Sequence, residues 1–376
     1  MKKRYDELDS LRGLAALSVV FFHYLSSLPI FTTPTSWAQS PYIASLTNTP
    51  LHLFWAGSEA VIFFFILSGF VLSLHLSKKG VGIKAFLVKR FFRIYPAYYV
   101  AIAIAIGLCL LLRQVGHIQG LSDFFNNIWK GPLTFSTILN HITLVRYFGY
   151  GQFNPVLWTL VMEVRISLIF PIIMFFINRY SWKLNLIGGL CLSLFYYTLS
   201  NNGTRHELFS IPLDYVSTLS FIMMFVIGAV LAKHHSQLIT IFKKFSSNTR
   251  YVLLFIAILL YTVRFWLLSH FEMYTSTFLS DINIAAGVSL FILLAMSMRS
   301  EILKKNPLVF LGKISYSLYL YHAIALLAFV HLLYPSINIV TIWVLSFITT
   351  LIVSIASYTF IEKPAIQLGH HLAKKL

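Results

Sequence analysis

The chain has 376 residues, of which 58% are hydrophobic and only 11% are charged, and its mean hydropathy is +0.77. Soluble domains carry about 25% charged residues, so this composition excludes a soluble globular protein and indicates a polytopic membrane protein. The formal net charge of +17 is accounted for by basic cytoplasmic segments that face anionic lipid, and it does not call for nucleic acid as a partner.

Apolar segments of about 17 to 25 residues, each long enough to cross a hydrocarbon core of about 30 Å, recur along almost the whole chain. These segments lack the alternation of polar and apolar residues that membrane barrels show, so the predicted fold is all-α. About ten transmembrane helices are expected, at 11–28, 55–76, 94–112, 155–177, 184–200, 215–232, 251–268, 281–298, 314–334 and 338–360. The connections between them are short, which predicts one transmembrane domain over residues 1–376 without an appended soluble domain.

The distribution of basic residues predicts the orientation of the helices, because Lys and Arg are retained in the cytoplasm during insertion. With a cytoplasmic N-terminus, 23 of the 29 Lys and Arg residues fall in cytoplasmic segments. Both the N-terminus and the C-terminus are therefore expected in the cytoplasm. Cys109 and Cys191 lie inside expected spans, so the sequence predicts neither a disulfide framework nor a thiolate metal site, and we expect no metal.

Ionisable residues inside the expected spans are candidates for function, because each costs about 2.5 to 3.5 kcal/mol to insert into the bilayer. They are His23, Glu163, Arg165, Arg264 and His322, with Glu59 at the outer end of the second span. Arg12 precedes His23 by three helical turns plus a small remainder, so the two residues share one face and lie about 16 Å apart along the axis. A ligand held at Arg12 could therefore extend its reactive end to His23 near the bilayer midplane. The alternative is that Arg12 is a topological anchor and that His23 makes an interhelical hydrogen bond.

The partners of the other residues in the spans stay open. The expected depth of Glu163 allows contact with His23, and a carboxylate at one imidazole nitrogen would leave the other nitrogen free as a base. The alternative is a structural ion pair of Glu163 with Arg165 or Arg264, although residues 163 and 165 project about 200° apart on a helix. His322 also falls near the midplane, either as a hydrogen-bonded bundle histidine or as a further site residue.

The segment KKGVGIKAFLVKRFFRIYPAYY connects the second and third expected spans. Within it, Arg90 and Arg93 are three residues apart, which makes them neighbours on one helix face at the inner membrane surface. Their forked guanidinium groups suit phosphate oxygens. The alternative is positive charge that only marks a cytoplasmic loop, and the spacing does not decide between the two.

Six stretches, taken in chain order, together resemble one family. They are LDSLRGLAALSVVFFHY, FFFILSGFVLS, RFFR, LWTLVMEVRISLIFP, LGKISYSLYLYH and YTFIEKP, and they extend over almost the whole chain. This set is similar to the integral-membrane acyltransferase family 3, whose members acylate hydroxyl groups on cell-surface glycans, lipids and small molecules. The resemblance implies ten transmembrane helices with both ends in the cytoplasm, in agreement with the distribution of basic residues.

The resemblance also implies a function in the cytoplasmic (inner) membrane of a bacterium. It implies that an acyl-CoA, most commonly acetyl-CoA, is the cytoplasmic co-substrate and that the acceptor lies on the other face. A cell-surface polysaccharide or a lipid-linked glycan is the expected acceptor, with membrane lipid as the surroundings, while lipids and secreted small molecules stay open. By its motifs, the resemblance implies that Arg12, His23, Arg90, Arg93 and Glu163 are functional positions. We expect His23 and Glu163 to act in catalysis and Arg12, Arg90 and Arg93 to bind the donor, with His322 and Arg165, which lie inside the spans, as additional candidates.

The chemistry expected from these residues is acyl transfer assisted by a buried base. The donor phosphates would contact Arg90 and Arg93, and the thioester would lie near His23, which would either take the hydroxyl proton or carry the acyl group itself. Glu163 would orient His23 or stabilise its imidazolium form. Two other classes stay open, namely a transporter or flippase for an acylated or glycan substrate, in which the buried groups relay protons, and a scaffold without catalysis.

Overall fold

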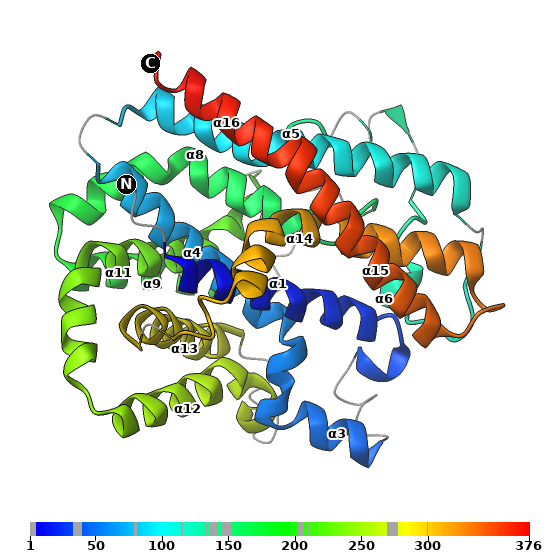
Figure 1. Cartoon of the computed structure of the whole chain (residues 1–376), viewed down its shortest axis with the longest axis horizontal. Helices are drawn as coiled ribbons and strands as arrows, with labels where there is room; N and C mark the ends of the chain where they lie inside the picture. Colours follow the sequence, from blue (N-terminus) through cyan, green and yellow to red (C-terminus); the bar gives the residue numbers. More distant parts are fainter. Residues whose placement is uncertain are drawn as a thin grey trace.

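The computed structural model describes residues 5–32, 40–78, 81–113, 116–131, 134–135, 138, 141–144, 152–201, 207–208, 211–268, 277–298 and 300–376. In this part of the chain, nine helices are long and apolar enough to cross a membrane, which confirms the all-α polytopic fold (Figure 1). They are built on α1 (Asp6–Leu25), α4 (Gly57–Leu76), α5 (Ile83–Leu112), α8 (Leu157–Arg179), α11 (Thr218–Lys244), α12 (Ser247–Val263), α13 (Thr277–Met298), α14 (Asn306–Leu333) and α15 (Ile339–Ser357).

The remaining elements are short or less apolar. The tenth expected span, 184–200, lies in α9 (Trp182–Asn201), a helix of 20 residues whose mean hydropathy is lowered by Lys183 and Asn185. The shorter helices are η1 (Pro29–Phe31), α3 (Pro41–Thr47), η2 (Pro50–Trp55), α6 (Asp123–Asn126), α10 (Leu213–Val216), η3 (Arg264–Leu268), η5 (Tyr358–Glu362) and α16 (Lys363–Leu372). Two strands of two residues each, β1 (Glu207–Leu208) and β2 (Ile211–Pro212), pair antiparallel.

Helix α5 begins at Ile83, well before the expected span 94–112, so the basic segment with Arg90 and Arg93 is helical rather than a loop. The sequence explains the extension, because no Gly or Pro interrupts residues 83–95 and because Phe86 and Ile94 bury apolar side chains along it. The C-terminal helix α16 packs beside this part of α5 (Figure 1). The packing is close, since a Cβ at Gly369 would lie 2.5 Å from the Cβ of Phe92.

Glycines allow two pairs of helices to pack backbone against backbone, as membrane helices commonly do. In the pair α1 and α14, a Cβ at Gly13 would lie 2.7 Å from the nitrogen of Gly312. In the pair α4 and α11, a Cβ at Gly69 would lie 2.2 Å from the carbonyl oxygen of Phe225, and a Cβ at Gly228 would lie 2.0 Å from that of Ile66. These contacts set the height of each helix relative to its neighbour.

The buried apolar residues form two clusters with polar side chains between them. One cluster lies mainly on α4, α8, α11 and α13, and the other lies mainly on α5 and α14. Helices α1 and α8 each contribute several residues to both clusters. Phe65 belongs to the first cluster, and Ile94 and Leu160 belong to the second. All three line the cavity described below, so this cavity lies where the two clusters meet.

Candidate active site

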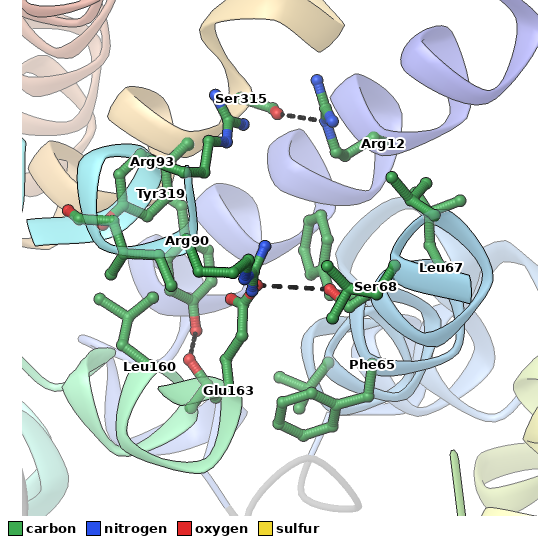
Figure 2. A pocket seen from close by; sticks show the side chains of 17 residues that line it. Arg12, Phe65, Leu67, Ser68, Arg90, Arg93, Leu160, Glu163, Ser315 and Tyr319 are labelled. Atoms are coloured by element: carbon green, nitrogen blue, oxygen red, sulfur yellow. Dashed lines mark hydrogen bonds and ion pairs between the residues drawn. The ribbon is translucent and has the colours of Figure 1, made fainter. Parts of the chain in front are cut away.

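A cavity of about 160 Å³ lies between α1, α4, α5, α8 and α14 (Figure 2). Its charged lining residues are Arg12, Arg90, Arg93 and Glu163, which are four of the residues that the sequence nominated. They come from three helices, α1, α5 and α8, whose positions in the chain are far apart. Three guanidinium groups and one carboxylate line the cavity, and the carboxylates of Asp9 and Glu362 pair with Arg12 and Arg93 from outside the lining.

Arg90 is paired with Glu163 inside this cavity. Its Nη2 lies 2.5 Å from Oε1 of Glu163 and 3.0 Å from the hydroxyl oxygen of Ser167, one turn further along α8. Ser68 of α4 donates a longer hydrogen bond of 3.4 Å to the same carboxylate oxygen. The pair therefore joins α4, α5 and α8 at one point and holds the Arg90 guanidinium in a defined direction (Figure 2).

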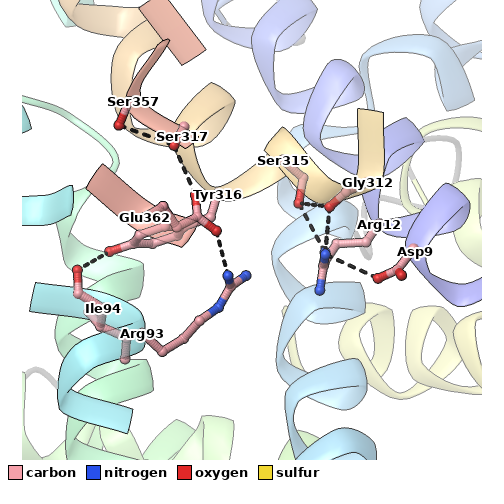
Figure 3. A network of polar contacts seen from close by, with 10 residues as sticks. All are labelled: Asp9, Arg12, Arg93, Ile94, Gly312, Ser315, Tyr316, Ser317, Ser357 and Glu362. Atoms are coloured by element: carbon pink, nitrogen blue, oxygen red, sulfur yellow. Dashed lines mark hydrogen bonds and ion pairs between the residues drawn. The ribbon is translucent and has the colours of Figure 1, made fainter. Parts of the chain in front are cut away.

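Arg93 is paired with a second carboxylate that sequence reasoning did not nominate. Its Nη1 donates to Oε1 of Glu362, whose other oxygen accepts a hydrogen bond of 2.9 Å from Ser317 (Figure 3). The guanidinium also lies 5.6 Å from the centre of the Tyr316 ring. Glu362 is buried. The sequence signal that could have identified it is a carboxylate directly after the last apolar span, in the stretch YTFIEKP.

Arg12 is held by backbone and side-chain oxygens of α14. Its Nε donates to the hydroxyl oxygen of Ser315 at 2.9 Å, and its Nη2 donates to the carbonyl oxygen of Gly312 at 2.5 Å (Figure 3). Asp9, one turn earlier on α1, provides an ion pair at 3.1 Å. These contacts place the guanidinium at the end of the cavity nearest the start of α14.

His23 and His322 lie together beyond the other end of the cavity. Nδ1 of His23 is 3.2 Å from Nε2 of His322, and the ring centres are 5.0 Å apart. His322 is completely buried, whereas His23 is half-buried. The lining of the cavity along α14 extends to Tyr319, one turn before His322, and the Tyr319 and His322 rings are 6.0 Å apart.

The hypothesis that Glu163 orients His23 is wrong for the contacts seen here. Glu163 contacts Arg90 and Ser68, while His23 contacts His322 and the carbonyl oxygen of Val19. The depth of Glu163 along its helix does not determine which neighbour its helix face meets.

Arg165 points away from the cavity. Its guanidinium lies 4.1 Å from the centre of the Tyr215 ring, and its Nη1 donates to the hydroxyl oxygen of Thr218 at 3.2 Å. Residues 163 and 165 therefore face opposite sides of α8, as their helical spacing predicts. These contacts with α10 and α11 support a packing role for Arg165.

The described residues contain no group of three or more His, Cys, Asp or Glu side chains that could hold a metal ion. The groups that converge on the cavity are instead guanidiniums, carboxylates and hydroxyls, with an imidazole pair close by. Such a set can bind phosphate, orient a thioester and move a proton, all without a change of oxidation state.

The sequence matches a known protein family and several named proteins. A family model described as an acyltransferase domain matches residues 5–359. A protein named "Putative O-acetyltransferase" from Staphylococcus aureus (strain COL) is 26% identical, and the match covers 96% of this chain and 58% of the relative. The "O-acetyltransferase OatA" of S. aureus (strain NCTC 8325 / PS 47) is 23% identical, and the match covers 95% of this chain and 56% of the relative.

The match extends over a larger share of a viral protein. The "Putative acetyltransferase ORF330" of Acidianus two-tailed virus is 27% identical, over 86% of this chain and 84% of its own length. The chain thus spans a little more than half the length of the staphylococcal relatives. No solved structure matches this chain.

Proposed function

Because this chain belongs to the acyltransferase domain family, we propose that it is a membrane O-acetyltransferase. The proposed reaction transfers an acetyl group from acetyl-CoA to a hydroxyl group of an acceptor on the other side of the membrane. The names of the similar proteins support acetyl as the acyl group. The observation that carries the proposal is the cavity that gathers Arg12, Arg90 and Arg93 and ends one turn from the His23–His322 pair.

The donor phosphates are proposed to bind Arg90 and Arg93. Both guanidinium groups line the cavity, they are one helical turn apart, and each is oriented by a carboxylate, Glu163 or Glu362. Guanidinium groups held in this way can turn their remaining N–H donors to phosphate oxygens. With a cytoplasmic N-terminus, which the distribution of basic residues favours, this end of the cavity faces the cytoplasm, where coenzyme A is available.

Arg12 is proposed to bind the donor between its phosphates and its thioester. It lies on the same face of α1 as His23, about 16 Å away along the axis. The path between the two residues passes along α14, whose Ser315, Tyr316 and Tyr319 line the cavity. An extended pantetheine arm of coenzyme A suits this narrow path, since most of the remaining lining is apolar.

His23 is proposed to act as a general base. In the reaction the acceptor hydroxyl loses its proton to a ring nitrogen of His23, and its oxygen forms a bond with the acyl carbon while the C–S bond of the thioester breaks. The imidazolium then returns the proton to the thiolate of coenzyme A, so that His23 ends the cycle neutral. A positioned base contributes about 10²- to 10⁴-fold to such a rate.

The acceptor is proposed to be a cell-surface polysaccharide or a lipid-linked glycan at the outer face of a bacterial cytoplasmic membrane. The many apolar helices suit a multi-pass membrane protein, and the half-buried His23 lies close to Phe124 of α6, outside the membrane-spanning helices. An acceptor chain that approaches from the side of α6 would reach His23 from the end opposite to the donor.

The test is acyl transfer by the purified protein in lipid vesicles, with radiolabelled acetyl-CoA and extracted cell-surface glycans. Label is expected on the glycan fraction with the wild type and to be lost with His23→Ala. The exposed His117, which lies outside the cavity, gives the matched control His117→Ala, for which transfer should continue. Transfer at the wild-type rate by a correctly inserted His23→Ala protein would refute the role of His23 as the general base. Movement of the glycan across the bilayer without any acyl donor would favour a transporter.

A further inference from the structure

The two histidines meet because their helices share a register. Both residues lie ten positions after the glycines that pack against each other, Gly13 on α1 and Gly312 on α14. Arg12 contacts Gly312 and Ser315 at one end and His23 contacts His322 at the other, so the two helices run parallel. Equal rises of about 15 Å from the glycine contact therefore bring the two imidazoles to the same height.

A contact with a backbone carbonyl shows which ring nitrogen of His322 carries the hydrogen. Its Nδ1 lies 3.1 Å from the carbonyl oxygen of Leu318, one turn earlier on the same helix. A carbonyl oxygen can only accept, so Nδ1 carries the hydrogen. His322 is fully buried, where the neutral imidazole is favoured, and its Nε2 then has a lone pair.

A backbone carbonyl also shows which ring nitrogen of His23 carries the hydrogen. Its Nδ1 lies 3.0 Å from the carbonyl oxygen of Val19, so this nitrogen also carries the hydrogen. The same N–H points to Nε2 of His322, 3.2 Å away, which accepts it. Nε2 of the neutral His23 is consequently the nitrogen with a free lone pair. If His322 instead donated from Nε2 to Nδ1 of His23, the lone pair of that Nδ1 would face the carbonyl oxygen of Val19. His322 would also need a second proton to keep its hydrogen bond to Leu318.

We propose that His322 is the positioning residue of the base His23, a proposal that rests on the proposed acyltransferase function. His322 accepts the hydrogen of Nδ1 and so keeps the lone pair of His23 on Nε2. When Nε2 takes the proton of the acceptor hydroxyl, the bond to His322 becomes charge-assisted and stronger. The proton then leaves from Nε2 to the thiolate, and His322 stays neutral throughout.

A neutral acceptor suits this depth better than a carboxylate does. In many hydrolases an aspartate accepts from the catalytic histidine, and it carries a charge in every step. A buried carboxylate inside the hydrocarbon region costs free energy unless it is paired, and here Glu163 in the cavity and the nearby Glu362 are both paired with arginines. An imidazole that accepts through Nε2 supplies the same direction of hydrogen bond without a permanent charge.

The kinetic test compares two replacements of His322 in vesicles. His322→Leu removes the acceptor, and His322→Gln supplies an amide oxygen at about the same position. We expect His322→Leu to lower kcat at least about tenfold with a donor KM within twofold of the wild type, and His322→Gln to recover most of kcat. His331→Leu, a loss of another buried histidine from α14, is the control and should keep kcat.

A spectroscopic test separates this inference from the proposed function. The protein with ¹⁵N-labelled imidazoles is measured by solid-state NMR, and the His23 signals are assigned by their loss in His23→Asn. The wild type should show His23 with a protonated Nδ1 and a bare Nε2. In His322→Leu the carbonyl oxygen of Val19 still accepts from Nδ1 but the second acceptor is lost, so the share of the tautomer with a protonated Nε2 should rise. A bare Nδ1 in the wild type, or an unchanged kcat in His322→Leu, would overturn the inference. Absence of acyl transfer in the wild type would instead refute the proposed function, since the tautomer can be measured without turnover.

Discussion

Gly13 of α1 and Gly312 of α14 lie in direct backbone contact. A Cβ at Gly13 would lie 2.7 Å from the nitrogen of Gly312, and a Cβ at Gly312 would lie 1.9 Å from the carbonyl oxygen of Asp9. This contact lies beside Arg12 and sets the height at which His23 meets His322. The site at both ends of the cavity therefore depends on two residues without side chains.

The first prediction concerns this contact. Gly312→Ala should separate α1 from α14, because backbone atoms of Asp9 cannot move aside as the end of a flexible side chain can. Overpacking of this kind costs about 1 to 3 kcal/mol of stability. We expect a lower midpoint of thermal unfolding in detergent and a fall in acyl transfer of at least about tenfold, by analogy with the misplacement of catalytic groups.

A matched control is available on α5. Nothing lies within 4 Å of a Cβ at Gly107, so Gly107→Ala should leave both the midpoint and the activity close to those of the wild type. If Gly312→Ala is as stable and as active as Gly107→Ala, the glycine contact does not position the site.

The second prediction is that Arg90 and Glu163 are coupled. Their side chains are 16% and 23% exposed, so removal of either one leaves a partly buried charge without its partner. Arg90→Gln and Glu163→Gln should each destabilise the protein, and the double variant should cost less than the sum, with a coupling of about 0.5 to 3 kcal/mol. The coupling is measured from the unfolding free energies of the wild type, the two single variants and the double variant in mixed detergent micelles. Additive costs would mean that the 2.5 Å contact contributes nothing to stability.

The third prediction assigns Glu362 to the orientation of Arg93. Glu362→Gln keeps the shape but loses the charge that holds the guanidinium, so donor binding should weaken and the donor KM should rise severalfold. The exposed Glu301, which pairs with Lys304 at 3.1 Å, provides the control Glu301→Gln. Steady-state kinetics with varied acetyl-CoA test the difference. Equal KM values for the two variants would contradict a role of Glu362 at the donor site.

The fourth prediction concerns the effect of pH on stability through His52, which lies in η2 outside the membrane-spanning helices. Burial, reinforced by the charge of Arg264, lowers the pKa of His52 from 6.5 to about 3. Glu59 lies 3.9 Å away, beyond hydrogen-bond distance, so its carboxylate does not accept a hydrogen bond from the imidazole.

The direction in which pH changes the stability follows from proton binding at His52. Between pH 6.5 and pH 3 the unfolded chain binds a proton at His52 and the folded chain does not, so stability falls as the pH decreases through this window. The loss between pH 7 and pH 5 amounts to about 2 kcal/mol. His52→Phe, which can keep the ring contact with Phe265, should lose this part of the pH dependence in thermal unfolding. An identical pH dependence in the variant and the wild type would show that His52 titrates normally in the folded protein.

The membrane fold could be predicted from the sequence because its cause is local. The length and apolarity of each segment decide whether it crosses a bilayer, and nine of the ten expected spans match long apolar helices in the described part of the chain. Glu163 could be nominated for a similar reason, because a charged residue inside an apolar span is costly. Arg12, Arg90 and Arg93 are nominated by helix spacing and by the resemblance, and all four residues line one cavity.

The partners of these residues could not be predicted in the same way. Hydropathy does not determine how far a helix is rotated or how high it lies against its neighbour. For that reason the sequence leaves the partner of Glu163 open, and the structure pairs it with Arg90. In the same way, the stretch YTFIEKP does not indicate that Glu362 pairs with Arg93. One signal was present in the sequence, because Gly13 and His23 have the same spacing as Gly312 and His322. It becomes informative only when α1 and α14 are known to be parallel neighbours.

The sequence by itself determined that the protein is a bundle of membrane helices with charged and imidazole side chains inside it. Tertiary structure decided which of these side chains form pairs, since the backbone contact between Gly13 and Gly312 sets the relative height of two helices that are far apart in the chain. A shift of about 1.5 Å, the rise of one residue, would place a different side chain opposite His23. The His23–His322 pair is therefore a property of helix packing, which composition and periodicity do not encode.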